Sequence, residues 1–211
     1  MFLLMLTWMQ GRKLMAARAY AATAAYDGMI SQWFALADQG ETFPEMLAVN
    51  ALLDIRAEFA PYLDLQLVAF PQDGYLRLPA NRDHMVRALD MGVDVVGGIP
   101  HFERTMADGA ESVRILCEIA ADLGKRVDMH CDETDDPMSR HVETLACQTQ
   151  RLGLQGRVAG SHLTSMHSMD NYYVSKLIPL MAEAQLHAVA NPLINITLQG
   201  RHDSYPRRRG M

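Results

Sequence analysis

Near the middle of the chain, an alternating apolar segment ends in a histidine, and a glutamate follows three residues later. The segment covers residues 126–130, so the two side chains are His130 and Glu133. A second strand-like segment, residues 157–161, runs directly into His162. Barrel enzymes place the groups of their active sites at the carboxyl ends of parallel strands. Because imidazoles bind divalent metals and a carboxylate can transfer protons, this pattern predicts metal-assisted hydrolysis.

Each of these residues has a functional interpretation and a structural alternative. His130, aimed rigidly by its strand, is the candidate metal ligand, and a core histidine bonded to a backbone carbonyl is the alternative. Glu133 is the candidate general acid and base. Its alternative is a carboxylate at a helix N-terminus, which is also our interpretation of Asp132, Asp135 and Asp136.

The other candidate side chains follow neighbouring strand-like segments. His162 is expected to bind the metal or to hold the attacking water and polarise the leaving group. Gln72 offers a hydrogen-bond donor and an acceptor that suit the edge of a heterocycle, and a loop-capping glutamine is the alternative. His101 and Glu103 are expected to support the site or anchor loops. Cys131 should point away from His130, because side chains alternate along a strand, and it is interpreted as a packing residue.

A unit of about thirty residues recurs from residue 60 onward, each with a strand-like run followed by a helical segment. The predicted strands are residues 65–70, 93–99, 126–130, 157–161 and 187–190. Gly92, Gly124 and Gly153 precede three of these strands and are expected to end helices. Asp136 and Pro137 are expected to begin the helix after His130. This α/β pattern predicts a (β/α)₈ TIM barrel, with a doubly wound sheet as the alternative.

Composition limits the classes of partner. The chain has 211 residues, 49% hydrophobic and 21% charged, as expected of a globular α/β protein. Its net charge of −6 argues against general binding of nucleic acid or anionic membranes, and no segment is apolar for the length of a membrane span. Three cysteines without paired spacing indicate reduced thiols in a cytoplasmic protein. Exposed sheet edges and fifteen methionines favour a homo-oligomer.

Several long motifs, in order, resemble the bacterial cytosine deaminase branch of the amidohydrolase superfamily. They lie at residues 68–72, 94–103, 128–133, 161–168, 190–196 and 198–210. The resemblance covers about residues 51–211 and implies a partial TIM-barrel domain there. Residues 1–50 do not match the family and are expected to be helical, at residues 13–26, 29–38 and 44–59, the last running into the matching part.

The resemblance implies a role for each candidate residue. It makes His130 a ligand of a divalent iron or zinc ion, Glu133 the proton shuttle, and His162 the histidine that contacts metal-bound water. Gln72 would hydrogen-bond the pyrimidine ring. The implied reaction is hydrolytic deamination of a cyclic amidine nucleobase of the cytosine or isocytosine type, with release of ammonia from a small-molecule substrate.

Two motifs of that family are absent from the sequence. The family carries a His-x-His pair on its first barrel strand and an aspartate ligand on its last strand, in a Gly-His-Asp context. No His-x-His occurs here, and the chain stops at Met211 before such a strand. We therefore expect a truncated gene product that lacks the first and last barrel strands, with little or no turnover and a metal site that does not retain its ion. An inactive fragment or a heterocycle-binding remnant is the alternative function.

Overall fold

A computed structural model describes residues 47–200 and divides the chain into two compact units, Met1–Leu65 and Gln66–Met211. In the first unit, helix α2 spans Leu47–Phe59, within the predicted helix at residues 44–59. The predicted helices at residues 13–26 and 29–38 lie outside the described residues. The predicted domain boundary near residue 50 marks where the resemblance to the family begins. The division into compact units rests on contacts within the chain, so the boundary stays a prediction.

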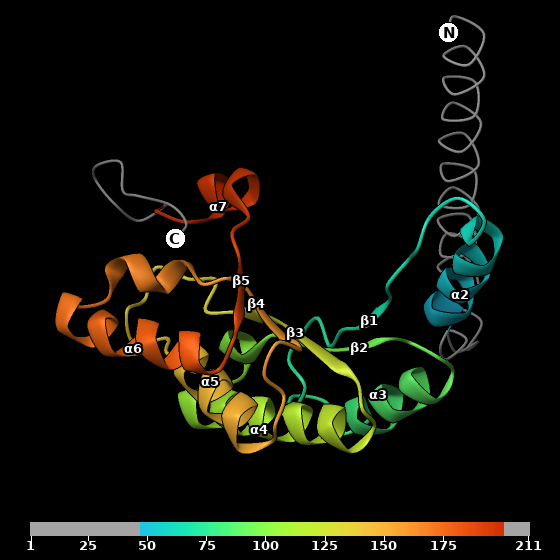
Figure 1. Cartoon of the computed structure of the whole chain (residues 1–211), viewed down its shortest axis with the longest axis horizontal. Helices are drawn as coiled ribbons and strands as arrows, with labels where there is room; N and C mark the ends of the chain where they lie inside the picture. The colour runs from blue at the N-terminus through green and yellow to red at the C-terminus, as the bar shows by residue number, and fades with distance from the viewer. Residues whose placement is uncertain (1–46, 201–211) are drawn as a thin grey trace, which may run out of the picture. The chain divides into compact units, whose positions relative to one another are not determined.

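The second unit is built on a five-stranded, all-parallel sheet (Figure 1). All five predicted strands are confirmed, at Val68–Ala69 (β1), Val95–Gly98 (β2), Arg126–Cys131 (β3), Val158–His162 (β4) and His187–Val189 (β5). Their order in space, β1-β2-β3-β4-β5, is their order in sequence. A doubly wound sheet reverses its strand order at a switch point, whereas a barrel does not. The topology is therefore that of part of a TIM barrel.

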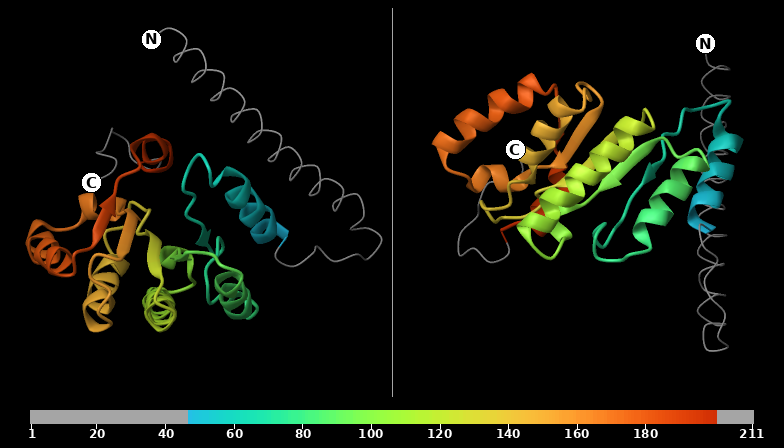
Figure 2. Two further views of the ribbon diagram at one scale, coloured as in Figure 1. Left: turned by 45° about the vertical axis from the view of Figure 1, so that its right-hand side comes forward. Right: turned by 90° about the horizontal axis from the view of Figure 1, so that it is seen from below.

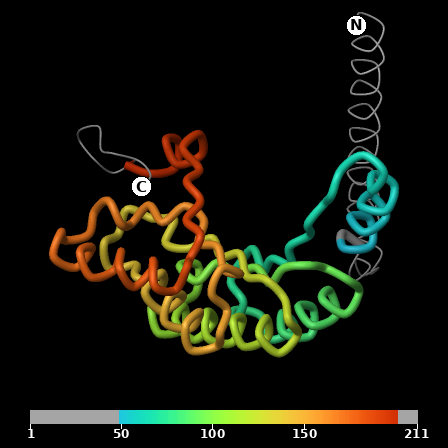
Figure 3. The backbone as a smooth tube through the Cα atoms, in the orientation of Figure 1, coloured from blue at the N-terminus to red at the C-terminus, as the bar shows by residue number. Residues whose placement is uncertain are grey.

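Helices cover one face of this sheet, as the two further views and the backbone tube show (Figures 2 and 3). The covering helices are α3 (Asn81–Asp90), α4 (Met106–Asp122), α5 (His141–Arg151) and α6 (Asn171–Glu183). Two short 3₁₀ helices follow strands, η1 at Pro100–Phe102 and η2 at Thr164–Ser168, and helix α7 (Pro192–Leu198) follows β5. Each of the four covering helices returns the chain for the next parallel strand, as right-handed βα units require.

The core lies between the sheet and the covering helices. Leu116 of α4, Met129 of β3 and Leu145 of α5 are fully buried. The two edge strands differ from this centre, because Val68 of β1 is 38% exposed and Val189 of β5 is 42% exposed. Burial is thus greatest in the three central strands, β2, β3 and β4, and the ends of the last two carry the predicted catalytic groups.

The helix ends follow the sequence signals in most cases. Gly92, Gly124 and Gly153 have φ angles of 105°, 64° and 67° and end their helices as predicted. The predicted start of α5 at Asp136 and Pro137 is wrong. The helix begins at His141, and the Asp136 carboxylate instead accepts a hydrogen bond from the Met138 amide at 2.8 Å, within the loop.

The pairing of the cysteines and the lengths of the helices complete the description of the fold. Cys117, Cys131 and Cys147 are all unpaired, and Cys131 is fully buried on the face of β3 opposite to His130, as predicted for a packing residue. Among the helices of residues 47–200, none has the length and apolar character that crossing a membrane would require.

Replacing Leu116 with alanine is expected to destabilise the protein by about 2–5 kcal/mol, because it removes a fully buried side chain and leaves a cavity beneath the sheet. The measurement is the free energy of unfolding in urea. Leu123→Ala, at the end of the same helix, is the control: its side chain is 45% exposed, and its loss should change stability by less than 1 kcal/mol. Equal effects of the two variants would contradict this account of the core.

Candidate active site

The carboxyl ends of β3 and β4 bring the two predicted imidazoles together. Parallel pairing places His130 beside Ser161 and Cys131 beside His162. The ring centroids of His130 and His162 are 4.8 Å apart, and the ring of Phe70, just after β1, lies 4.5 Å from that of His130. The strand register, set by alternating buried residues, is therefore what aims both imidazoles at one place.

Glu133 joins this pair through a close contact with His162. Its Oε1 atom lies 3.0 Å from Nδ1 of His162, and Nδ2 of Asn195 donates to the same oxygen at 3.1 Å. The second amide hydrogen of Asn195 goes to Oε1 of Gln199, at 2.9 Å. Nδ1 of His162 also forms a hydrogen bond with Oδ1 of the Asn195 amide, at 3.3 Å. His162 and Asn195 thus fix the orientation of the Glu133 carboxylate.

The backbone at these strand ends adopts a conformation that side chains disfavour. Asp132, His162 and Leu163 have φ angles of 54°, 75° and 51°. Residues with side chains persist at positive φ only where their surroundings fix them, and such residues gather at functional sites. Here the strained residues immediately follow or end the two strands that carry the candidate groups.

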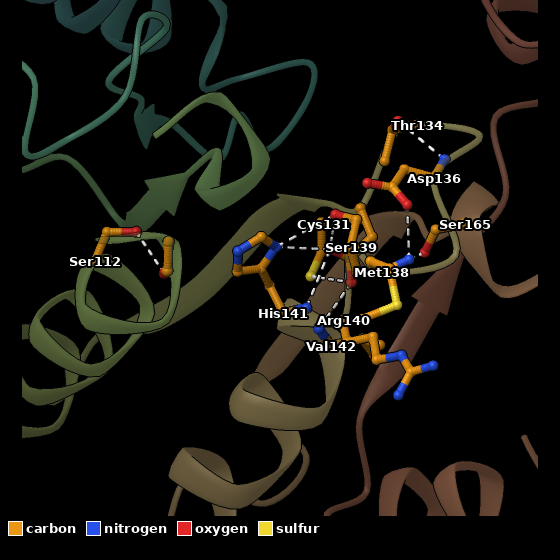
Figure 4. A network of polar contacts seen from close by, with 12 residues as sticks. Ser112, Cys131, Thr134, Asp136, Met138, Ser139, Arg140, His141, Val142 and Ser165 are labelled. Carbon is orange, nitrogen blue, oxygen red and sulfur yellow. Dashed lines mark hydrogen bonds and ion pairs between the residues drawn. The ribbon is translucent and has the colours of Figure 1, made fainter. Parts of the chain in front are cut away.

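The side chain of Asp132 is fully buried, and its hydrogen bonds hold the loop after β3 against the start of α5. One of its carboxylate oxygens accepts hydrogen bonds from Oγ of Ser139 (2.7 Å) and Nδ1 of His141 (2.8 Å), and the other accepts from the amide of Val142 (2.8 Å) (Figure 4). Burial by itself would raise the pKa of Asp132, but the bonds from His141, Ser139 and Val142 outweigh it and lower that pKa. The ionised carboxylate therefore caps the start of α5.

His130 has the properties of an isolated ligand. Its Nδ1 atom is buried and has no hydrogen-bond partner. Burial, and secondly the neighbouring His162, lowers its pKa, which favours the neutral ring that binds metals. A catalytic zinc site, however, normally has three protein ligands. Between residues 47 and 200, no group of three or more His, Cys, Asp or Glu side chains is placed to hold a metal, and the role of His130 as a metal ligand stays a prediction.

A cavity of about 420 Å³ lies beside Glu133, at the ends of β2 and β3. It is lined by His101, Glu103, Thr105, Glu133, Ser139 and His141, among others. Burial, the largest influence, lowers the pKa of His101 to about 4. Oε1 of Glu103 accepts hydrogen bonds from the amides of Tyr75 at 2.6 Å and Leu76 at 3.0 Å, so Glu103 is the loop anchor that the sequence suggested.

The structure brings three of the four predicted site residues together. His130, His162 and Glu133 form one cluster. Gln72 instead lies exposed in a turn that is closed by a hydrogen bond from the Gly74 amide to the Pro71 carbonyl. Sequence analysis missed Asn195, a fully buried residue of α7. The signal was present: Asn191 follows the last described strand, and Asn195 lies one helical turn further on.

Comparison with known proteins identifies the family. Residues 15–211 match the Amidohydrolase family. This chain belongs to that family. The match begins within the first fifty residues, and the sequence-based resemblance to the cytosine deaminase branch is confirmed.

Two solved structures and one further relative show where in the family the chain lies. It is 46% identical, with a TM-score of 0.76, to 5-methylcytosine deaminase from Klebsiella pneumoniae, crystallised with phosphonocytosine, over 78% of this chain and 40% of that one. An N-isopropylammelide isopropylaminohydrolase from Burkholderia multivorans is 27% identical, with a TM-score of 0.62, over 68% and 37% of the two chains. A pterin deaminase from Rhizobium rhizogenes is 35% identical over 46% and 22%.

The matched region is only part of each relative. The chain spans less than half the length of these proteins. The comparison confirms a partial TIM-barrel fold. Members of the superfamily are generally metal-dependent, but the described residues specify no particular metal.

Replacing Asp132 with asparagine is expected to lower the free energy of unfolding by about 3 kcal/mol, because it removes a buried charge that accepts five hydrogen bonds and sets an amide donor against a backbone donor. Urea unfolding measures the effect. Asp122→Asn, on an exposed residue at the end of α4, is the matched control and should change stability by less than 0.5 kcal/mol, as is usual on the surface. If both variants lost the same free energy of unfolding, the hydrogen bonds of Asp132 would not be what holds this region together.

The lowered pKa of the buried His101 side chain predicts that the stability of the protein depends on pH. Its pKa is about 4 in the folded protein and about 6.5 in an unfolded chain, so between these values only the unfolded chain binds the proton. Stability should therefore fall as pH drops from 6.5 to 4, by about 3 kcal/mol from this group. His101→Phe should reduce that fall in pH-dependent unfolding measurements, and His84→Phe on α3 should not. An identical pH profile for wild type and His101→Phe would refute the prediction.

Proposed function

We propose that this chain carries the proton-transfer part of a hydrolytic deaminase site for a cyclic amidine nucleobase of the cytosine or isocytosine type. The observation that carries the proposal is the 3.0 Å contact between Oε1 of Glu133 and Nδ1 of His162, next to the ring of His130. Relatives that act on nucleobase-like rings, a 5-methylcytosine deaminase and a pterin deaminase, support the choice of reaction.

The chemistry assigns one task to each residue. Glu133 takes a proton from the attacking water and passes it to the ring nitrogen beside the amidine carbon. Water oxygen then bonds to that carbon, the bond to the exocyclic nitrogen breaks, and ammonia leaves with the second proton. His162, whose Nδ1 lies 3.0 Å from Oε1 of Glu133, helps to position that carboxylate for both transfers.

Gln72 and the metal complete the proposal. Gln72 would hydrogen-bond the substrate ring, which requires the exposed turn after β1 to close over it. The divalent iron or zinc ion of the reaction would take His130 as one ligand, consistent with the unpartnered Nδ1 of that residue. When bound, such an ion lowers the pKa of water and so supplies the nucleophile.

A second candidate function is binding of a heterocycle without turnover. One observation favours it: the described part of the chain offers no cluster of three metal-binding side chains. In that case the site would keep its hydrogen-bonding groups and lose the hydrolytic step. We accordingly expect the absolute rate of the 211-residue chain to be low, and the ratio between variants to be the informative quantity.

The test is ammonia release from cytosine, 5-methylcytosine and isocytosine by the full chain supplied with iron(II) or zinc. Glu133→Gln should reduce the rate about 10²–10⁴-fold, because it removes the general acid and base while keeping the size of the side chain. Glu183→Gln, on an exposed residue that ends α6, is the matched control and should leave the rate unchanged.

The outcomes separate the two functions. Release that depends on Glu133 supports deamination. Release that survives Glu133→Gln would overturn the assigned role of that residue. Where the wild type releases no ammonia from any of the three compounds but binds cytosine in a calorimetric titration, the second function holds.

A further inference from the structure

Glu103, which directly follows η1, holds the stretch of backbone that comes after Gln72. Its Oε1 atom accepts hydrogen bonds from the amides of Tyr75 at 2.6 Å and Leu76 at 3.0 Å. One oxygen that accepts from two successive backbone amides fixes both the position and the direction of that backbone. Tyr75 is 4% exposed, so the anchored stretch is packed into the protein. The anchor thus joins the loop after β2 to the loop after β1.

Gly74 connects this anchor to the turn that carries Gln72. The Gly74 amide closes the turn on the Pro71 carbonyl at 3.0 Å, and the Gly74 carbonyl accepts a hydrogen bond from Nδ2 of Asn81 at 2.8 Å. Gly74 has a φ angle of 99°, and a Cβ atom built on it would lie 3.0 Å from Oε2 of Glu103. A glycine is therefore what allows the backbone to approach the carboxylate so closely.

The other end of the turn is held at the candidate active site. The ring centroid of Phe70, the residue before Pro71, lies 4.5 Å from that of His130. Gln72 thus lies two residues after a ring that packs against the active-site cluster and two residues before the anchored Gly74. Its own side chain is exposed. The turn therefore presents an exposed amide from a backbone that is held on both sides.

We infer that Glu103 is a positioning residue for substrate recognition, because it fixes the backbone from which the Gln72 amide reaches the ring of the substrate. The inference rests on the proposed function, in which Gln72 hydrogen-bonds the ring of a cyclic amidine. A group that is already held in place loses less conformational freedom on binding, so the anchor strengthens the affinity for the ring. Oε2 of Glu103 is buried, which supports a role through Gln72 rather than by contact with the ligand.

The test is a double-mutant cycle on the affinity of the full chain for cytosine, measured by calorimetric titration. Gln72→Ala should raise the Kd about tenfold, as expected for the loss of one hydrogen bond. Glu103→Ala should raise the Kd by a similar factor in the wild-type background, and by less than about twofold when residue 72 is already alanine. Glu183→Ala, on the exposed residue that ends α6, is the matched control and should not change the Kd.

The cycle separates positioning from direct contact. If Glu103 contacted the ligand itself, the two losses would add, and the double variant would bind cytosine about a hundredfold more weakly than the wild type. Such additivity overturns the inference, and so does a Kd of Glu103→Ala equal to that of the wild type.

A second measurement uses the wild-type protein and so does not depend on how a variant folds. The backbone amides of Tyr75 and Leu76 should exchange slowly with solvent, because Glu103 accepts from both. The side-chain amide resonances of Gln72 should shift when cytosine is added. Rapid exchange of both backbone amides, or unmoved Gln72 resonances in the presence of saturating cytosine, contradicts the inference.

The results also distinguish this inference from the proposed function. Glu133-dependent ammonia release together with wild-type cytosine affinity in Glu103→Ala would refute the inference alone. Ammonia release that survives Glu133→Gln, together with coupled losses at Gln72 and Glu103, would overturn the role of Glu133 and support the inference. A chain that does not bind cytosine would overturn both.

Discussion

The buried carboxylate of Asp132 is the constraint on which the geometry of the site depends. Its carboxylate accepts hydrogen bonds from His141 and Val142 at the start of α5. Its backbone carbonyl accepts hydrogen bonds from the amides of Thr134 at 2.9 Å and Ser165 at 3.1 Å. The first set fixes the loop after β3 to the next helix, and the second fixes it to the loop after β4. Glu133, the next residue, has little freedom left and can only point where Asp132 allows.

The same links explain how His162 is held at an unfavourable backbone angle. The amide of Leu163, the next residue, donates to the carbonyl of Cys131 at 3.0 Å, and Oγ of Ser165 donates to the carbonyl of Ser139 at 2.9 Å. These bonds tie the end of β4 to the end of β3 and extend the parallel pairing past the strands. The strain at His162 is thus offset by backbone bonds, and the imidazole gains a fixed direction toward Glu133.

Much of the fold could be predicted from sequence because it is a repeat of one local pattern. Apolar alternation located β3 and β4 to within one residue, and glycines marked the ends of three helices. The start of α5 could not be predicted in this way, because its cap is the side chain of Asp132, nine residues before the helix, rather than a residue next to it. A cap formed across a loop leaves no local signature in the sequence.

The site shows the same division between local and long-range information. His130, His162 and Glu133 follow strands directly, so strand periodicity sufficed to bring them together. Asn195, which donates to Glu133 from a helix 62 positions later, and the exposure of Gln72 both depend on how distant segments pack.

The same reasoning explains why a metal could be expected from the sequence while the described residues do not complete its ligand set. Strand ends β3 and β4 supply two imidazoles, but the third ligand of a catalytic site has to come from a further segment. Two adjacent parallel strands can direct two ligands to one metal position, but they cannot supply ligands on its other sides. The groups that orient Glu133, by contrast, are His162 of β4 and Asn195 of α7, so the described part of the chain already sets the direction of that carboxylate.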